Sequence, residues 1–261
     1  MATPNAERLN NTQNVNIGIT LRDLMEAGVY YGHRRRKWHP KMKPYIYDYR
    51  RGVFIIDIRK TFEQLQIAYL KAKEVSSKGG NIIFVCTKPQ GKDVIKEEAK
   101  RAGVFYVTER WLGGLLTNFE TIKKRLEYID ELENLLKEIN EAMENKRPIP
   151  YRKKDVYRME RELKRMHRYY DGLRGLNDLP DLLYIVDIVR EETAVLEARK
   201  LGIPVIGICD TNADPEMVDY PIPANDDSIR SIRLITKVIA NAIIEGREGF
   251  ESELTKGETN G

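Results

Sequence analysis

The sequence of 261 residues predicts a doubly wound α/β protein, in which a mainly parallel sheet is covered by helices on both faces and a pair of long helices is inserted. Two observations predict this architecture. Short apolar runs, continuous rather than alternating, are each followed by an amphipathic helical pattern, which is typical of parallel strands buried on both faces. Between two groups of such units, apolar residues recur at spacings of three and four over a long charged stretch, which is the pattern of two helices packed along a seam.

The elements of the first group follow in order. Residues 1–16 are polar and rich in Asn, and we expect a flexible tail. Thr20 is expected to cap a short helix that runs through Gly28, with Asp23 completing a variant capping box. After a basic segment (residues 32–51), strand-like runs are expected at residues 53–58, 81–86 and 104–107. One helix is expected to follow the first of these runs and to end at Lys78, and another is expected at residues 92–102.

The second group repeats the alternation. Strand-like runs are expected at residues 182–188 and 204–209 and near Pro221, and helices at residues 191–201 and 228–244. We therefore assign the α/β globular domain to residues 17–118 and 172–245, and we expect residues 246–261 to form a second flexible tail.

An antiparallel coiled-coil hairpin is predicted for the inserted residues 119–171. The chain turns at Pro148 and Pro150, and the first half is acidic while the second is basic. The two halves would attract each other along their flanks, by only about 0.3–0.5 kcal/mol for each exposed pair. The basic run therefore has two interpretations, as a partner for the acidic helix or as a contact with RNA. The expected seam consists of Ile122, Leu126, Ile129, Leu132, Leu136, Ile139 and Met143 from the first half, and Val156, Met159, Leu163, Met166 and Tyr170 from the second.

Composition narrows the classes of function. Basic residues number 44 and acidic residues 40, so any affinity for nucleic acid must come from where the charge is placed. Cys86 and Cys209 each end an apolar run, which predicts buried, reduced thiols and a cytoplasmic protein. We expect neither a signal peptide nor a membrane role, because the start lacks an apolar stretch and no run approaches the length of a membrane span.

The basic segment, residues 32–51, is the strongest functional signal. Eight Lys or Arg face a single Asp there, and aromatic rings are interleaved with the charges. Pro40 and Pro44 prevent a regular helix, so a stiffened and largely extended loop is expected. Guanidinium groups bind phosphate oxygens in pairs and aromatic rings stack on unpaired bases, which together favour RNA binding over a merely solvated loop. The predicted contacts are Arg34, Arg35, Arg36, Lys37, Trp38, Lys41, Lys43, Tyr45, Arg50 and Arg51.

A glycine-containing stretch from Arg110 to Asn118 joins the first group to the inserted helices. Its paired Gly113 and Gly114 would let the backbone approach a phosphate or another chain closely, with Arg110 and Asn118 beside them as further RNA contacts. An ordinary hinge around a buried Trp111 explains the same residues equally well. Asn118 is also placed to cap the first inserted helix.

No enzyme motif accompanies the predicted sheet. Parallel sheets bind ligands at the carboxyl ends of their strands, where this chain places Asp57, Thr87, Asp187 and Asp210. The sequence has neither a phosphate-binding glycine loop nor a nucleophile elbow, and its three histidines lack zinc-ligand spacing. We therefore expect no catalytic residue, cofactor or resident metal. The alternatives are an enzyme with a small-molecule site at Asp187 and Asp210, and a metal held by those carboxylates and a histidine.

Three stretches together resemble one family, the bacterial-type small-subunit ribosomal protein S-two. They are residues 24–33 running into 38–46, residues 110–118, and residues 180–187 with Glu191, Glu197 and residues 202–204. The resemblance covers about residues 17–245, and three motifs in the right order around a helical insertion make it highly specific. His39 stands where the family pattern generally has Asn, and Arg34 with Arg35 makes the segment more basic than usual.

The resemblance implies a non-catalytic constituent of the small ribosomal subunit, with a flavodoxin-like or Rossmann-like sheet and a protruding coiled-coil hairpin. Such a protein would bind small-subunit ribosomal RNA, lie as a monomer among other small-subunit proteins, and help to recruit the large protein S-one. A protein-only adaptor that uses the hairpin seam is the remaining alternative.

Overall fold

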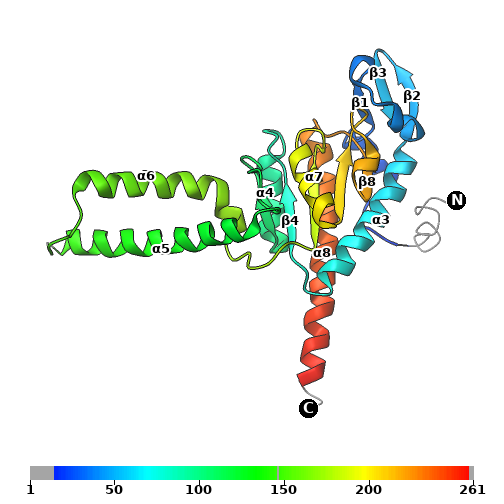
Figure 1. Ribbon diagram of the computed structural model, residues 1–261. Coiled ribbons are helices and arrows are strands. Elements are labelled where there is room, and N and C mark those ends of the chain that lie inside the picture. Colours follow the sequence, from blue (N-terminus) through cyan, green and yellow to red (C-terminus); the bar gives the residue numbers. More distant parts are fainter. Residues whose placement is uncertain (1–14, 146, 259–261) are drawn as a thin grey trace.

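A computed structural model describes residues 15–145 and 147–258 of the chain (Figure 1). At its centre lies a five-stranded parallel sheet in the order β5-β4-β6-β7-β8. Every residue of β4, β6 and β7 is buried, which is why these strands appear in the sequence as continuous apolar runs. The strands are β4 (Ile82–Val85), β5 (Phe105–Val107), β6 (Leu182–Val186), β7 (Val205–Cys209) and β8 (Tyr220–Pro223).

Helices cover both faces of this sheet, which confirms the predicted doubly wound α/β class. Alternate strand residues, such as Phe84 and Tyr184, share one apolar core with α3, α4 and α8. Their neighbours, such as Ile83 and Leu183, share a second core with α7 and the inner ends of two longer helices. The covering helices are α3 (Ile58–Ser76), α4 (Lys92–Ala102), α7 (Glu192–Leu201) and α8 (Ile229–Glu258).

The order of the strands creates a switch point in the sheet. β5 lies on one side of β4, and the chain then crosses to β6 on the other side. In parallel sheets, ligands bind beyond the carboxyl ends of the strands that flank such a point. A small-molecule site of this fold would therefore lie between the loops after β4 and β6.

Residues 31–56 contain a second, antiparallel sheet, in the order β1-β3-β2, that the sequence did not predict. The run at residues 53–58, expected as a parallel strand, forms β3 of this sheet. Arg51 and Gly52 have positive φ angles of 51° and 84°, and they make the tight turn that reverses the chain between β2 and β3. The strands are β1 (Tyr31–Arg34), β2 (Ile46–Arg50) and β3 (Val53–Ile56).

The basic segment is consequently not an extended loop. Between β1 and β2 it forms two 3-10 helices, η1 (Arg35–Lys37) and η2 (Pro40–Tyr45). Proline at the start of η2 and again within it excludes a regular α-helix but fits a short helix of this kind. The His39 N–H donates to the Thr211 carbonyl oxygen at 2.8 Å, which fixes the segment against the loop after β7.

The ends of the chain differ in part from expectation. α2 (Leu21–Glu26) begins with the predicted capping box of Thr20 and Asp23, but it ends before Gly28. Residues 1–14 of the expected N-terminal tail lie outside the described residues. α8 runs on to Glu258, into the expected C-terminal tail, and Arg247 donates to the carbonyl oxygens at the end of α4. None of the described helices is long and apolar enough to cross a membrane.

Two long helices, α5 (Phe119–Glu144) and α6 (Lys153–Tyr170), lie side by side and project from the domain (Figure 1). Their apolar contacts fall into two parts. Inner residues such as Ile122 and Met166 belong to the core beneath the parallel sheet. Further out, Leu132, Leu136, Ile139 and Val156 form a small core of their own, whereas Met143, expected in the seam, is 39% exposed.

The predicted attraction between acidic and basic flanks is not made as rows of ion pairs. In the described part of the chain, a single carboxylate contact of this type joins α5 to α6, from Glu133 Oε1 to His167 Nε2 at 2.9 Å. Arg168 of α6 pairs instead with Glu109, outside the helix pair, with its Nε 3.1 Å from Glu109 Oε2.

Leu136→Asp is expected to unfold the outer part of this helix pair while the sheet stays folded. Leu136 is 5% exposed in the outer core, so Asp would bury an unpaired charge among apolar side chains. Circular dichroism should show helix loss before the main thermal transition, whose midpoint should barely move. Lys137→Asp, at an exposed neighbour, is the control. Loss of all cooperative unfolding in Leu136→Asp would show that the helices and the sheet form one unit.

Candidate nucleic-acid interface

The basic segment presents a group of free cations at the edge of the antiparallel sheet. Arg34, Arg36 and Lys37 line a hollow of about 700 Å³, together with His33, with Val53 of β3 and with Asp227 from the loop after β8. No acidic partner lies within ion-pair distance of the group in the described part of the chain. Its members, all exposed, are Arg34, Arg35, Arg36, Lys37, Lys43 and Arg51.

Two predicted RNA contacts are already engaged by carboxylates. Lys41 Nζ lies 2.8 Å from Asp214 Oδ2 and 2.5 Å from Glu216 Oε2. Arg50 Nε lies 2.6 Å from Asp48 Oδ2. These exposed ion pairs are weak, so RNA could compete for the cations, but their charge is not free as that of Arg34, Arg35 and Arg36 is. The charge of Lys37 helps to lower the pKa of Asp227 in the same hollow.

The two rings predicted to stack on bases pack against the protein instead. Trp38 and Phe54 have ring centres 5.3 Å apart, and the buried Trp38 Nε1 has no hydrogen-bond partner among the described residues. Tyr45 is half-buried against the second core, and burial raises the pKa of its hydroxyl. Both rings hold the segment in place, which leaves little of either for an unpaired base.

An exposed aromatic face covers the antiparallel sheet and α2. Tyr47 is 64% exposed, Met25 55% and Tyr31 50%. The rings of Tyr30 and Tyr31 lie 4.2 Å apart, and their hydroxyls share a hydrogen bond of 3.0 Å. Sequence reasoning missed this face because its residues come together only when β1, β2 and β3 pair. It lines two hollows of about 530 and 870 Å³, and we call the following set the aromatic face: Leu21, Met25, Tyr30, Tyr31, Tyr47 and Ile55.

The glycine-containing stretch is a turn held by a carboxylate within the chain. Glu197 accepts hydrogen bonds from the backbone N–H groups of Gly114, Leu116 and Thr117 at 2.8, 2.9 and 3.1 Å. It also accepts one from the indole N–H of the buried Trp111 at 3.2 Å. Burial alone would raise the pKa of Glu197, but the N–H donors outweigh it and lower the pKa. This geometry favours the hinge interpretation, and nothing in the local sequence pointed to Glu197 as its anchor.

The other residues of that stretch lie at the base of the helix pair. Arg110 is exposed beside α5 and α6, where it lines a hollow of about 560 Å³. Gly113 is exposed, with open space where a side chain would be. Asn118 stands at the N-cap of α5 but makes no capping bond; its Oδ1 accepts from the Thr121 hydroxyl at 2.8 Å. Arg110, Gly113, Gly114 and Asn118 therefore do not share a hollow with the basic segment.

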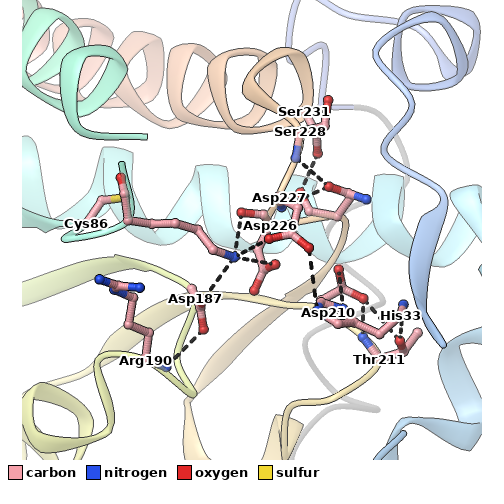
Figure 2. Close-up of polar contacts among 12 residues, drawn as sticks. His33, Cys86, Asp187, Arg190, Asp210, Thr211, Asp226, Asp227, Ser228 and Ser231 are labelled. Atoms are coloured by element: carbon pink, nitrogen blue, oxygen red, sulfur yellow. Dashed lines mark hydrogen bonds and ion pairs between the residues drawn. The ribbon is translucent and has the colours of Figure 1, made fainter. Parts of the chain in front are cut away.

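Lys88 lies at the switch point of the parallel sheet, in the loop beyond the carboxyl end of β4. Its Nζ is 2.9 Å from Asp187 Oδ2 and 2.8 Å from both Asp226 Oδ1 and Asp227 Oδ1. Figure 2 shows these three carboxylates gathered around one amino group. Asp187, which an enzyme would have used, is thus neutralised within the chain. Sequence reasoning missed Lys88 because its carboxylate partners lie far away in the sequence; Asp226, for example, follows 138 residues later.

A second polar group lies next to this network and could hold a metal. His33 Nδ1 is 3.0 Å from Asp210 Oδ2, and single ligand atoms of His33, Asp210 and Asp226 lie within 4.8 Å of one another (Figure 2). An imidazole with two carboxylates suits a divalent cation such as Zn²⁺. The sequence alternative paired a histidine with Asp187 and Asp210, whereas the structure brings Asp226 to His33 and Asp210 in place of Asp187; Lys88 contacts both Asp187 and Asp226.

Protonation of this group is shifted by its surroundings. Burial, reinforced by the charges of Asp210 and Asp187, raises the pKa of Asp226 to about 7. The hydrogen bond with Asp210 raises the pKa of His33 in spite of burial. Both groups hold a proton more tightly in the folded chain than in the unfolded one. Their contribution to stability is therefore present at low pH and lost as the pH rises through the raised values.

A family model described as Ribosomal protein S2 matches residues 24–246, which include the basic segment, the parallel sheet and both long helices. The chain belongs to this family. Small ribosomal subunit protein uS2 of Dictyoglomus turgidum is 53% identical over 235 residues, which are 90% of this chain and 93% of that protein. The protein of the same name from Coprothermobacter proteolyticus is 49% identical over 232 residues, 88% of this chain and 84% of that protein.

Family membership decides between the classes of function left open by the sequence. Ribosomal protein S2 is a structural, non-enzymatic family, so the chain is not an enzyme. The ion-pair network of Lys88 at the switch point is accordingly part of the architecture.

Proposed function

We propose that the chain is a structural constituent of the small ribosomal subunit in the cytoplasm, binds ribosomal RNA through its basic segment, and helps to recruit the large protein S-one. Membership of the ribosomal protein S2 family supports the ribosomal role. The observation that carries the RNA contact is the run of four exposed cations, Arg34–Lys37, with no ion pair to another described residue. Free guanidinium groups bind phosphate oxygens in pairs and lose little hydration in doing so.

The aromatic face is the surface that fits S-one. A contiguous patch of exposed apolar side chains is more often a protein-binding site than are apolar side chains that are exposed singly. Tyrosine and methionine are enriched at the centres of such contacts, and Tyr47, Met25 and Tyr31 are each at least half exposed. An apolar segment of S-one would cover them, while the free cations next to the face stay available to RNA.

Sedimentation of the native protein tests both parts of this proposal. The protein is expected to sediment with small subunits at low salt and to leave them as salt rises, because each phosphate contact adds about 0.7–0.9 to the slope of log affinity against log salt. After nuclease treatment S-one should remain bound, and Tyr31→Ser with Tyr47→Ser should release it, whereas Tyr128→Ser should not. Sedimentation apart from small subunits at low salt would refute the ribosomal role. Release of S-one by nuclease alone would refute the role of the aromatic face.

A further inference from the structure

Thr211, in the loop after β7, is hydrogen-bonded to the basic segment at two points. Its hydroxyl oxygen accepts from the His33 N–H at 2.7 Å, and its carbonyl oxygen accepts from the His39 N–H at 2.8 Å. Six residues of extended chain span about 20 Å, whereas two N–H groups bonded to the same residue lie much closer together. The chain between the two points therefore forms an arc whose ends are joined by one residue. The arc consists of Arg34, Arg35, Arg36, Lys37 and Trp38.

Strand β1 approaches Thr211 so closely that it leaves no room for a side chain on Gly32. A Cβ atom there would lie 2.5 Å from Thr211 Cγ2 and 2.8 Å from Thr211 Oγ1, so one of the two segments would have to move. The register between β1 and β3 is irregular over the same stretch, from Tyr31 to Arg34. The glycine thus allows β1 to turn the His33 N–H to the threonine hydroxyl at an irregular part of the ladder.

The hydroxyl of Thr211 is itself oriented by Asp210. Thr211 Oγ1 donates to Asp210 Oδ1 at 3.1 Å, which leaves the lone pairs of the hydroxyl oxygen to accept from His33 (Figure 2). Thr211 and Asp210 are both fully buried, so their orientation is fixed by these contacts and not by water. Loss of the hydroxyl would take away the acceptor that residue 211 offers to the His33 N–H, at the start of the arc.

An arc fixed at both ends is suited to binding phosphate. The side chains of Arg34, Arg35 and Arg36 are exposed and make no ion pair within the described ranges, so their placement depends on the backbone that carries them. If that backbone were free, binding RNA would have to order the chain as well as the side chains, at a cost in conformational entropy. With the arc already formed, only the side chains have to be ordered.

We infer that Thr211 is a positioning residue for RNA binding, which holds the arc in its binding conformation before RNA is bound and does not touch the RNA itself. The inference rests on the proposed function, since it takes the three arginines as RNA contacts. Removing the hydroxyl weakens binding without removing a cation. The slope of log affinity against log salt reports the number of phosphate contacts, so it stays the same while affinity falls at every salt concentration.

Thr211→Val and Thr211→Ser test this role by their binding to small subunits from which the protein has been removed. Valine keeps the branched shape of threonine without the hydroxyl, and serine keeps the hydroxyl. The valine variant should bind roughly tenfold more weakly at each salt concentration with an unchanged slope, and the serine variant should stay within about twofold of the wild type. A chelator selective for transition metals, which leaves Mg²⁺ in place, is present throughout so that no such metal at Asp210 contributes.

Thr236→Val is the matched control. Thr236 is fully buried like Thr211, and its hydroxyl shares a hydrogen bond of 2.9 Å with the Tyr184 hydroxyl, in the core between β6 and α8. This variant also loses a buried hydroxyl, but it should bind subunits as tightly as the wild type, since binding is measured well below the thermal midpoints. Gly32→Ala, which pushes β1 away from Thr211, should weaken binding as Thr211→Val does, and it carries the test if the valine variant does not fold.

The outcomes separate this inference from the proposed function. Wild-type affinity in Thr211→Val, or equal weakening in its valine and serine variants, would overturn the positioning role. Equal weakening in Thr236→Val would assign the effect to stability and overturn it too. If replacing Arg34, Arg35 and Arg36 leaves binding intact, the proposed RNA contact fails as well. If that replacement abolishes binding while Thr211→Val binds normally, the positioning role alone is wrong.

Discussion

Replacing Arg34, Arg35 and Arg36 by Glu is expected to exclude the chain from small ribosomal subunits. All three are exposed and make no ion pair within the described ranges, so each replacement reverses a free charge. If each arginine binds one phosphate, the slope of log affinity against log salt falls by about 2–3, and the new carboxylates repel the RNA in addition. The thermal midpoint should hardly change, because none of these side chains is buried.

Incorporation can be measured by adding labelled variants to subunits from which this protein has been removed. A variant with Lys96, Lys200 and Lys237 replaced by Glu is the control, because it makes the same change in net charge at exposed sites elsewhere on the domain. Only the arginine variant should fail to incorporate. Equal failure of the control would assign the effect to net charge, and normal incorporation of the arginine variant would remove the basic segment from the RNA interface.

Lys88→Met is expected to lower the free energy of unfolding by about 3–5 kcal/mol, as for other buried charge networks that lose one partner. Lys88 and Asp226 are 8% and 1% exposed, so Asp226, left without its cation, cannot turn into water. Chemical denaturation of the wild type and the variant gives the difference directly. Lys96→Met, at an exposed site, should change stability by no more than about 0.5 kcal/mol.

The loss in Lys88→Met should depend on pH. In the wild type, burial and the neighbouring Asp210 and Asp187 already raise the pKa of Asp226 to about 7, against the opposing effect of Lys88. Without Lys88 that pKa rises further, so the variant is destabilised most where Asp226 must be charged, above pH 7. At pH 5.5 the carboxyl is protonated in both proteins, and the difference should shrink. Both proteins are measured with a chelator present, so that no divalent cation binds His33, Asp210 and Asp226. A difference that is constant from pH 5.5 to pH 8.5 would show that Lys88 does not act through Asp226.

The parallel sheet could be predicted from the sequence because its signal is local. β4, β6 and β7 are buried on both faces, and α4 begins and ends at the residues that its pattern predicted, Lys92 and Ala102. The antiparallel sheet could not be predicted in the same way. β1 has no buried residue, and its pairing of Tyr31 with Ile55 is decided by contacts that local periodicity does not record.

The positive charge of the site could be predicted from the sequence. Which of its cations are free of ion pairs within the chain could not. The density of arginine between Gly32 and Arg51 is visible in the sequence. Which of those cations is free depends on distant residues, as when Lys41 meets Asp214, which follows 173 residues later. The aromatic residues show the same limit. Trp38 is held by Phe54, whereas Tyr47, which no motif singled out, is exposed.

The insertion of α5 and α6 between β5 and β6 has a consequence for how the chain folds as it is synthesised. β4 and β6 are neighbours at the centre of the sheet. Asn81 and Asp181, which immediately precede these two strands, are joined by a hydrogen bond, yet they lie 100 residues apart in the sequence. At about 5–20 residues per second, β4 therefore waits roughly 5–20 s for its partner, with one edge unpaired. Helix pairs have local contacts and form early. Once α5 and α6 have paired, the loop that must close is roughly twofold shorter, which lowers the entropy cost of closure by about 0.6 kcal/mol. The inserted helices are thus expected to hasten the same pairing of β4 with β6 that their synthesis delays.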